Sequence, residues 1–124
     1  MTTTILSARQ LAEFLYQRPF RIASERMLQD DVERAFISEG IAYEREKRLS
    51  ATDRVDFLVG RTALELKVKG QRRRHQAQIE RYASHDCVDA VVLLTNVPMA
   101  RSAVSTIGPM KKPCFYVFLG RSAL

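Results

Sequence analysis

A tight hairpin is the feature of this chain that most constrains its fold. Two largely apolar segments, residues 54–60 and 62–69, meet at Gly60-Arg61. Glycine at the first position of a two-residue loop suits a type II′ turn, which joins antiparallel strands. Counted outward from that turn, the register places Asp56 opposite Glu65. Opposite residues have Cβ atoms roughly 5 Å apart, so the segment predicts two adjacent carboxylates.

Lys67 is expected beside this pair. It lies two residues after Glu65, and side chains two apart share one face of a strand. The reverse face is predicted to enter the core through apolar neighbours, namely Phe57, Leu64, Leu66 and Val68. Two adjacent carboxylates repel each other unless a cation neutralises them. Their oxygen atoms suit Mg²⁺, which also binds phosphate oxygens, so a divalent ion is expected here.

A solvated hairpin face with an ordinary Glu-Lys neighbour pair is the alternative interpretation. Two features of the sequence oppose it. Both strands are otherwise apolar, which favours a central hairpin. Basic residues that a backbone phosphate requires follow directly, at Lys69, Arg72, Arg73 and Arg74.

The rest of the chain predicts helices around a mixed sheet. Ser7 and Ser24 are candidate N-caps, and Gly40 is a candidate helix terminator. The expected order is ααβββαβ(α)β, an α/β domain. Its elements are helices at 8–17 and 25–39, strands at 41–49, 54–60 and 62–69, a helix at 71–84, a buried strand at 88–94, a short helix or irregular stretch at 99–107, and a strand at 114–119.

Length and composition favour one domain. The chain has 124 residues, of which 46% are hydrophobic, enough for one core and too few for two. We expect a single domain over residues 1–124, with an N-terminal helix and linker at 1–23 and a core at 24–119. Cys87 and Cys114 show no metal-ligand spacing, which favours a reduced, cytoplasmic setting. Neither secretion nor membrane insertion is expected, because no run approaches the roughly 20 apolar residues of a membrane span.

The charge balance favours a polyanionic partner. Lysine and arginine number 20 against 14 acidic residues, a formal net charge of +6. Long-range attraction of this sign favours nucleic acid as the leading candidate.

The hairpin resembles the signature of the PD-(D/E)XK nuclease superfamily. Members carry an Asp on one strand and Glu-x-Lys on the next, here Val55-Asp56 and Glu65-Leu66-Lys67. The resemblance covers residues 24–119 and implies a restriction-endonuclease-like core. Val55 stands where many members have proline. Known members include restriction enzymes, phage exonucleases, RecB-type nuclease domains and Holliday-junction resolvases, and the chain is similar to the resolvases in being small and basic.

The resemblance implies roles for the hairpin residues. Asp56, Glu65 and the backbone carbonyl of Leu66 would hold one or two Mg²⁺ or Mn²⁺ ions. Lys67 would orient the nucleophile or stabilise the transition state. Members also carry an acidic residue on the preceding helix, which implies Glu33 as a further metal ligand and catalytic residue. Its rivals on the following strand are Glu44 and Glu46.

The helix after Lys67 supplies the last expected site residues. RecB-like members carry Gln-x-x-x-Tyr there, matched by Gln78 and Tyr82. Gln78 is expected to position the catalytic face, and Tyr82 to contact DNA together with the basic residues at 69 and 72–74.

The function expected from these features is metal-dependent hydrolysis of DNA, with an endonuclease favoured over an exonuclease. Two alternatives remain open: a Holliday-junction or other structure-specific endonuclease, and a non-catalytic DNA-binding accessory protein on the same fold. RNA also remains open as a substrate. A homodimer is plausible, through the first helix or residues 115–119.

Overall fold

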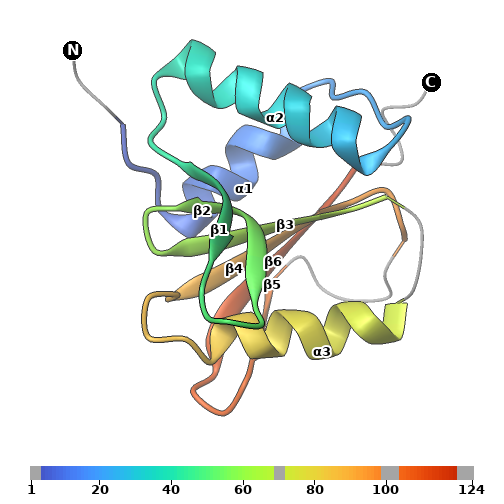
Figure 1. Cartoon of the computed structure of the whole chain (residues 1–124). Coiled ribbons are helices and arrows are strands. Elements are labelled where there is room, and N and C mark those ends of the chain that lie inside the picture. Colours follow the sequence, from blue (N-terminus) through green and yellow to red (C-terminus); the bar gives the residue numbers. More distant parts are fainter. Residues whose placement is uncertain (1–3, 69–71, 99–103, 120–124) are drawn as a thin grey trace.

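The protein is an α/β domain with helices on both faces of one mixed sheet (Figure 1). The structure, a computed structural model, describes residues 4–68, 72–98 and 104–119, and for residues 72–75 the backbone alone. The elements in chain order are α1 (Ala8–Tyr16), α2 (Glu25–Glu39), β1 (Glu44–Arg48), β2 (Arg54–Val59), β3 (Thr62–Lys67), α3 (Arg72–Ala83), β4 (Ala90–Thr95), β5 (Val104–Ile107) and β6 (Lys112–Phe118).

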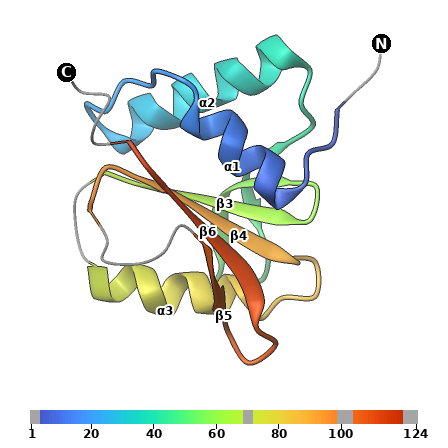
Figure 2. The same cartoon turned by 180° about the vertical axis from the view of Figure 1, so that it is seen from behind.

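The sheet has the order β1-β2-β3-β4-β6-β5. The pairs β1–β2, β2–β3 and β5–β6 are antiparallel, whereas β3–β4 and β4–β6 are parallel. Helix α3 makes the crossover between the parallel strands β3 and β4. Helices α1 and α2 cover one face, and α3 covers the other (Figures 1 and 2). The predicted mixed sheet flanked by helices is therefore confirmed.

The two N-terminal helices begin and end where the sequence predicts. Ser7 forms a capping box with Gln10, in which each side chain accepts a hydrogen bond from the other residue's backbone N–H. The Ser24 hydroxyl accepts from the N–H of Met27, and Gly40 ends α2 with φ 68°. Among the described helices, none is long and apolar enough to cross a membrane.

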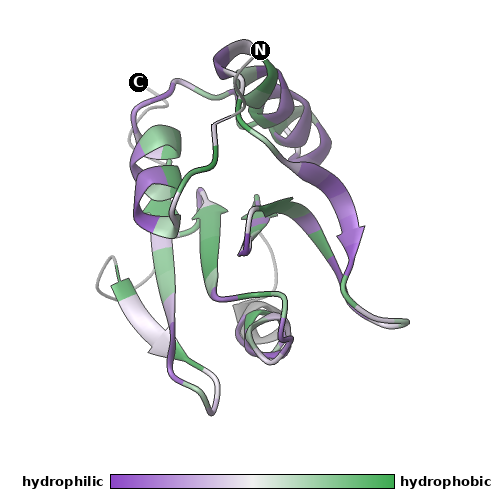
Figure 3. Cartoon of the chain, turned by 90° about the vertical axis from the view of Figure 1, so that its left-hand side faces the viewer, coloured by the Kyte–Doolittle hydropathy of each residue, from purple (hydrophilic) through white to green (hydrophobic). Residues whose placement is uncertain are grey.

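The core consists of two apolar layers, one on each face of the sheet. Strand β4 is buried along its whole length, as its continuous apolar sequence predicts. Figure 3 views the sheet from its side and shows hydrophobic residues gathered on the central strands. The layer under α1 and α2 includes Phe36, Phe57, Leu64, Leu66 and Val92. The layer under α3 includes Val55, Leu58, Ile79, Tyr82 and Val91.

One expected element is wrong. Residues 104–107 form strand β5 and pair with β6, where a short helix or irregular stretch was expected. Their sequence is rich in β-branched residues, which favour a strand. A tight four-residue connection follows, with φ 75° at Gly108 and 53° at Lys111, and returns the chain into β6. The remainder of that expectation, residues 99–103, lies outside the described residues.

Asp53 joins the β1–β2 turn to the end of α3. Its buried carboxylate accepts a hydrogen bond from Nε of Arg81 at 3.1 Å and lies 2.9 Å from Nε2 of His85. The hydrogen bond with His85 is the main cause that lowers the pKa of Asp53. Burial opposes this change, and Arg81 adds to it. Folding therefore favours the ionised form of this carboxyl group.

Replacing Asp53 with Asn should lower the free energy of unfolding by about 1–3 kcal/mol at pH 7, because charge-assisted hydrogen bonds are lost in a buried place. A pKa that folding lowers contributes stability above the unfolded value, roughly 3.9. That contribution is lost as the pH falls through the lower folded value. Urea unfolding should therefore show a smaller difference between variant and wild type at pH 3 than at pH 7.

Asp86→Asn is the matched control, because Asp86 is exposed and directly follows His85, the partner of Asp53. It should leave the free energy of unfolding within about 0.5 kcal/mol of the wild type. An Asp53→Asn difference that is absent, or equal at both pH values, would contradict this role of Asp53.

Candidate active site

The hairpin has the predicted register from its turn as far as Phe57 and Leu64, and the predicted backbone pair of Asp56 and Glu65 is not part of the ladder. Val59 pairs with Thr62, Leu58 with Ala63, and Phe57 with Leu64. Gly60 has φ 61° at the first position of the two-residue loop, as a type II′ turn requires. The backbone ladder between β2 and β3 ends at the pair of Phe57 and Leu64.

Beyond that pair, two side chains bridge the strands in place of the backbone. The N–H of Asp56 donates to Oε1 of Glu65 at 3.3 Å. The N–H of Leu66 donates to Oδ2 of Asp56 at 2.7 Å. Each carboxylate thus accepts a backbone hydrogen bond from the opposite strand. We call this arrangement of Asp56, Glu65 and the Leu66 N–H the carboxylate bridge.

Strand β1 is distorted at the same level. It pairs with β2 through Arg45 and Phe57 on one side and through Lys47 and Val55 on the other. Between these pairs lies Glu46, whose φ of 51° is unfavourable for a residue with a Cβ atom. The sheet therefore departs from regular geometry on both sides of Asp56.

The faces of β3 agree with the predicted alternation. Leu64 and Leu66 enter the core under α1 and α2, and Val68 packs against it. Glu65 is 3% exposed, and Nζ of Lys67 lies 3.4 Å from its Oε2 atom. The expected proximity of Lys67 to Glu65 is confirmed.

Helix α2 brings two residues to the carboxylate bridge that the sequence analysis missed. Nε2 of Gln29 donates to Oδ1 of Asp56 at 2.8 Å. One turn earlier, Oε2 of Glu25 accepts from the N–H of Val68 at 3.4 Å. Glu25, Gln29 and Glu33 are spaced four apart and share one helix face. That spacing was the available signal, but it does not say which turn lies beside β3.

Glu33, the helix residue expected as a metal ligand, is instead engaged with β1 and the segment before it. Its carboxylate accepts from the Tyr43 hydroxyl and from Nη1 of Arg45, both at 2.7 Å. These bonds, with the one from Tyr43 first, lower the pKa of Glu33. The rival Glu44 is exposed and pairs with Lys47. The structure therefore does not bring Glu33 or Glu44 to the carboxylate bridge.

The other rival, Glu46, is also directed elsewhere. Its Oε1 atom lies 3.7 Å from Nη1 of Arg54, and both side chains are about half exposed. Like Glu44, it is a surface residue of the edge strand.

Tyr82 packs behind the carboxylate bridge and does not contact solvent. It is 1% exposed, and its hydroxyl donates to the backbone carbonyl of Arg54 at 3.0 Å. Burial is the main cause that raises its pKa, and the charges of Glu65 and Asp56 add to it. The expectation that Tyr82 contacts DNA is therefore wrong, because its ring and hydroxyl are used inside the protein.

The remaining expected residues lie on or before α3. Gln78 is half-buried one turn before Tyr82, on the same helix face. The expected DNA contacts at 72–74 form the first turn of α3. Their side chains, and Lys69, lie outside the described residues.

Burial and mutual repulsion disfavour ionisation of both carboxylates. Burial is the main cause that raises the pKa of Asp56, and the charge of Glu25 adds to it, while the Leu66 N–H and Lys67 oppose it. Burial, followed by the charge of Asp56, raises the pKa of Glu65 to about 8, against the opposing effect of Lys67. Near neutral pH the pair therefore carries two negative charges only if a further positive charge compensates them.

The donor atoms of the carboxylate bridge fit a divalent cation. The N–H and C=O of a strand residue project from the same edge. Since the N–H of Leu66 donates to Asp56 on β2, the carbonyl oxygen of Leu66 also faces β2. In the described part of the chain, no group of three acidic, histidine or cysteine side chains is placed to hold a metal. Mg²⁺ commonly takes only one or two carboxylates and retains water.

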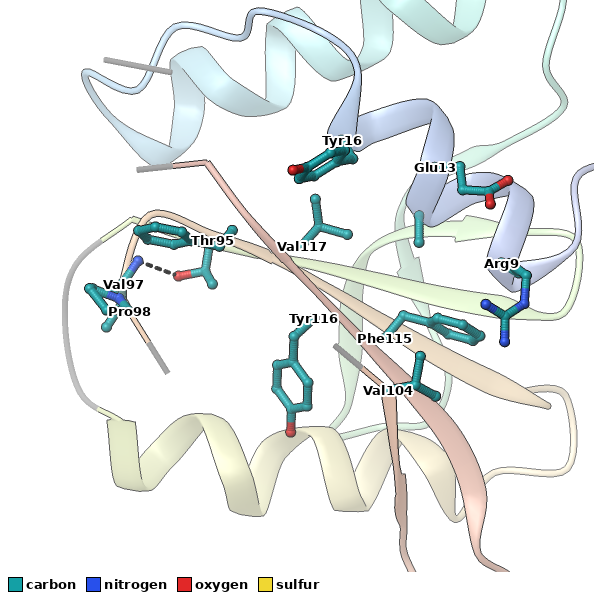
Figure 4. Close-up of a pocket in the computed structure, with 12 residues that line it drawn as sticks. Arg9, Glu13, Tyr16, Thr95, Val97, Pro98, Val104, Phe115, Tyr116 and Val117 are labelled. Atoms are coloured by element: carbon teal, nitrogen blue, oxygen red, sulfur yellow. Dashed lines mark hydrogen bonds between the residues drawn. The ribbon is translucent and has the colours of Figure 1, made fainter. Parts of the chain in front are cut away.

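A cavity of about 670 Å³ lies elsewhere, between α1 and β6 (Figure 4). Its wall includes Arg9 and Glu13 of α1 and apolar residues of β6 such as Phe115 and Val117. None of the carboxylate bridge residues is among its lining. It reaches Thr95, which pairs with Lys67 across the sheet. The paired acids and Lys67 make the carboxylate bridge the stronger candidate for chemistry.

Comparison of the chain with protein-family models, with curated proteins and with solved structures gives no match. The function of the carboxylate bridge must therefore be argued from its own geometry, burial and charge.

Glu65→Gln should stabilise the metal-free protein at high pH. A pKa that folding raises, here to about 8 from roughly 4.3 in unfolded chains, contributes stability below about pH 4. That contribution is lost as the pH rises to about 8. Above this pH the neutral amide removes a buried charge, so urea unfolding in EDTA at pH 9 should show a gain on the order of 1–3 kcal/mol.

At pH 4 the gain should disappear, because Glu65 is then protonated. Glu44→Gln, an exposed residue of the neighbouring edge strand, should change stability little at either pH. A Glu65→Gln protein that is less stable than wild type at pH 9 would contradict the electrostatic description of the site.

Proposed function

We propose that the protein is a metal-dependent nuclease that hydrolyses phosphodiester bonds of DNA, as a small member of the PD-(D/E)XK superfamily. The observation that carries this proposal is the carboxylate bridge with Lys67 beside it. Two buried acids repel each other, and Nζ of Lys67 lies 3.4 Å from Glu65. A fold gains little stability from such an arrangement, whereas a cation-binding site requires it.

A divalent cation at the bridge accounts for the two acids. Asp56, Glu65 and the carbonyl oxygen of Leu66 would hold Mg²⁺ or Mn²⁺. When bound, the cation would lower the pKa of water and offset negative charge on the phosphate. Both acids keep lone pairs for this purpose, because each hydrogen-bonded carboxylate oxygen can accept more than one partner.

Lys67 would act on the substrate from the same face. Its ammonium group is held by Glu65 and is still partly accessible, with 18% of the side chain exposed. A compact charge with three donors can stabilise phosphate oxygens or orient the attacking water. The buried Tyr82 and the core behind the carboxylates keep bulk water away from their inner side.

The DNA partner is supported by charge. The formal net charge is +6, and basic residues at 69 and 72–74 follow β3 directly in the sequence. Phosphate contacts of this kind give affinity without sequence specificity. An endonuclease acting as a homodimer is the preferred form, since one such domain cuts one strand of a duplex.

Loss of Glu65 or Lys67 should abolish cleavage. Glu65→Gln and Lys67→Met should each reduce the rate of plasmid nicking in Mg²⁺ or Mn²⁺ by at least about 100-fold, because electrostatic stabilisation of the transition state is lost. EDTA should abolish the wild-type activity. The measurement is conversion of supercoiled plasmid, with folding of each variant checked by circular dichroism.

The chain contains a matched control pair. Glu44 and Lys47 on the edge strand β1 form a solvent-accessible ion pair of 3.1 Å with each other. Glu44→Gln and Lys47→Met should therefore cleave like the wild type. Undiminished cleavage by the Glu65→Gln/Lys67→Met double variant would exclude this active site.

A second experiment compares wild-type cleavage of linear, single-stranded, flap, four-way and RNA substrates. Its pattern would distinguish the types of nuclease, and binding without cleavage of any substrate would indicate a binding protein without activity.

A further inference from the structure

Arg45 of strand β1 is held against helix α2 by several acceptors. Its Nη1 atom lies 2.7 Å from Oε1 of Glu33 and 3.0 Å from Oδ1 of Asp30. Its Nη2 atom donates to Oε1 of Gln29 at 3.0 Å. The guanidinium also lies over the ring of Phe57, 6.0 Å from its centroid. Arg45 therefore has one well-defined position between β1 and α2.

This position determines which way the amide of Gln29 points. A glutamine side chain has one oxygen that accepts and one NH₂ group that donates. Because Arg45 occupies the oxygen, the NH₂ group is directed to Asp56, where it donates to Oδ1 at 2.8 Å. A reversed amide would put NH₂ against the guanidinium and oxygen against the carboxylate, which is unfavourable at both ends.

Asp56 is thereby fixed through both of its oxygen atoms. Oδ1 accepts from Gln29, and Oδ2 accepts from the N–H of Leu66. Two donors on different elements define the plane of the carboxylate. One belongs to β3 and the other to α2, so the orientation of Asp56 depends on both elements.

We propose that Arg45 and Gln29 form an orienting relay that holds the Asp56 carboxylate ready to bind the divalent cation. This inference rests on the proposed function. Both residues are positioning residues, since Gln29 acts through Asp56 and Arg45 acts through Gln29. Glu33 belongs to the same relay one step further out, because its carboxylate accepts from Arg45 and is itself held by the hydroxyl of Tyr43.

A purely structural clamp between β1 and α2 would have different properties. It needs only the ion pairs of Arg45 with Glu33 and Asp30. The relay additionally requires that the effect of Arg45 on Asp56 passes through Gln29. Loss of Arg45 should then matter for Asp56 when Gln29 is present, and little once Gln29 is gone.

The test is a double-mutant cycle of Gln29→Met, Arg45→Met and the combined variant. Two readouts are measured: the Kd for Mn²⁺ by calorimetry, and hydrogen exchange of the Leu66 amide in metal-free protein. Gln29→Met should weaken Mn²⁺ binding by roughly tenfold, the usual size of effect for residues that orient metal ligands. It should also speed exchange of the Leu66 amide, because Asp56 is then free to rotate.

Arg45→Met should weaken binding several-fold and speed the same exchange, and the double variant should resemble Gln29→Met alone. Arg21→Met removes the ion pair between Arg21, which precedes α2, and Asp31 of α2, and it should change neither readout. If Arg45→Met fails to fold, Arg45→Lys replaces it. Lysine keeps the charge but lacks the fork that spans Glu33 and Gln29.

Unchanged Leu66 exchange in Gln29→Met, or independent additive effects of the two substitutions, would overturn the relay. Failure of the proposed function gives a different result. In that case the wild type binds no Mn²⁺ at all, while Leu66 exchange in the metal-free protein still reports whether Gln29 and Arg45 orient Asp56.

Discussion

The site depends on two hydrogen bonds that Asp56 and Glu65 accept from backbone N–H groups, each from the opposite strand, where the ladder between β2 and β3 ends. Regular sheet geometry ends after the pair of Phe57 and Leu64, and the two side chains complete the bridge. Backbone donors compensate part of the cost of burying these acids. The remaining repulsion destabilises the fold, as is common where a protein maintains a functional site.

The rest of the fold holds this bridge in place from three directions. The hairpin turn at Gly60 sets the register, and the apolar reverse face of β3 packs under α1 and α2. On the other face, Tyr82 of α3 lies behind the acids. From the side, α2 contributes Gln29, whose amide is oriented by Arg45. The same elements that bury the core therefore also position the ionisable groups.

Local features of this fold were predictable from the sequence, and distances between elements were not. Gly60 predicted the hairpin register, and alternation placed Lys67 with Glu65, because both follow from neighbouring residues. The choice of Glu33 failed because helix periodicity fixes a face but not the position along α2 that lies beside β3. For the same reason, Gln29 was not predicted as a site residue. The spacing of Gln78 and Tyr82 likewise predicted the helix face of Tyr82. Its burial was not predictable, because that depends on how α3 packs against the sheet.

The proposed nuclease requires that the carboxylate bridge binds a divalent cation. Calorimetric titration of Mn²⁺ into wild type and the Asp56→Asn/Glu65→Gln double variant tests it most directly, with Asp53→Asn as a variant that removes a carboxylate outside the site. We expect one saturable binding process in the wild type and in Asp53→Asn, and a loss of affinity of at least about 100-fold in the double variant. Equal Mn²⁺ affinity of the wild type and the double variant would contradict it.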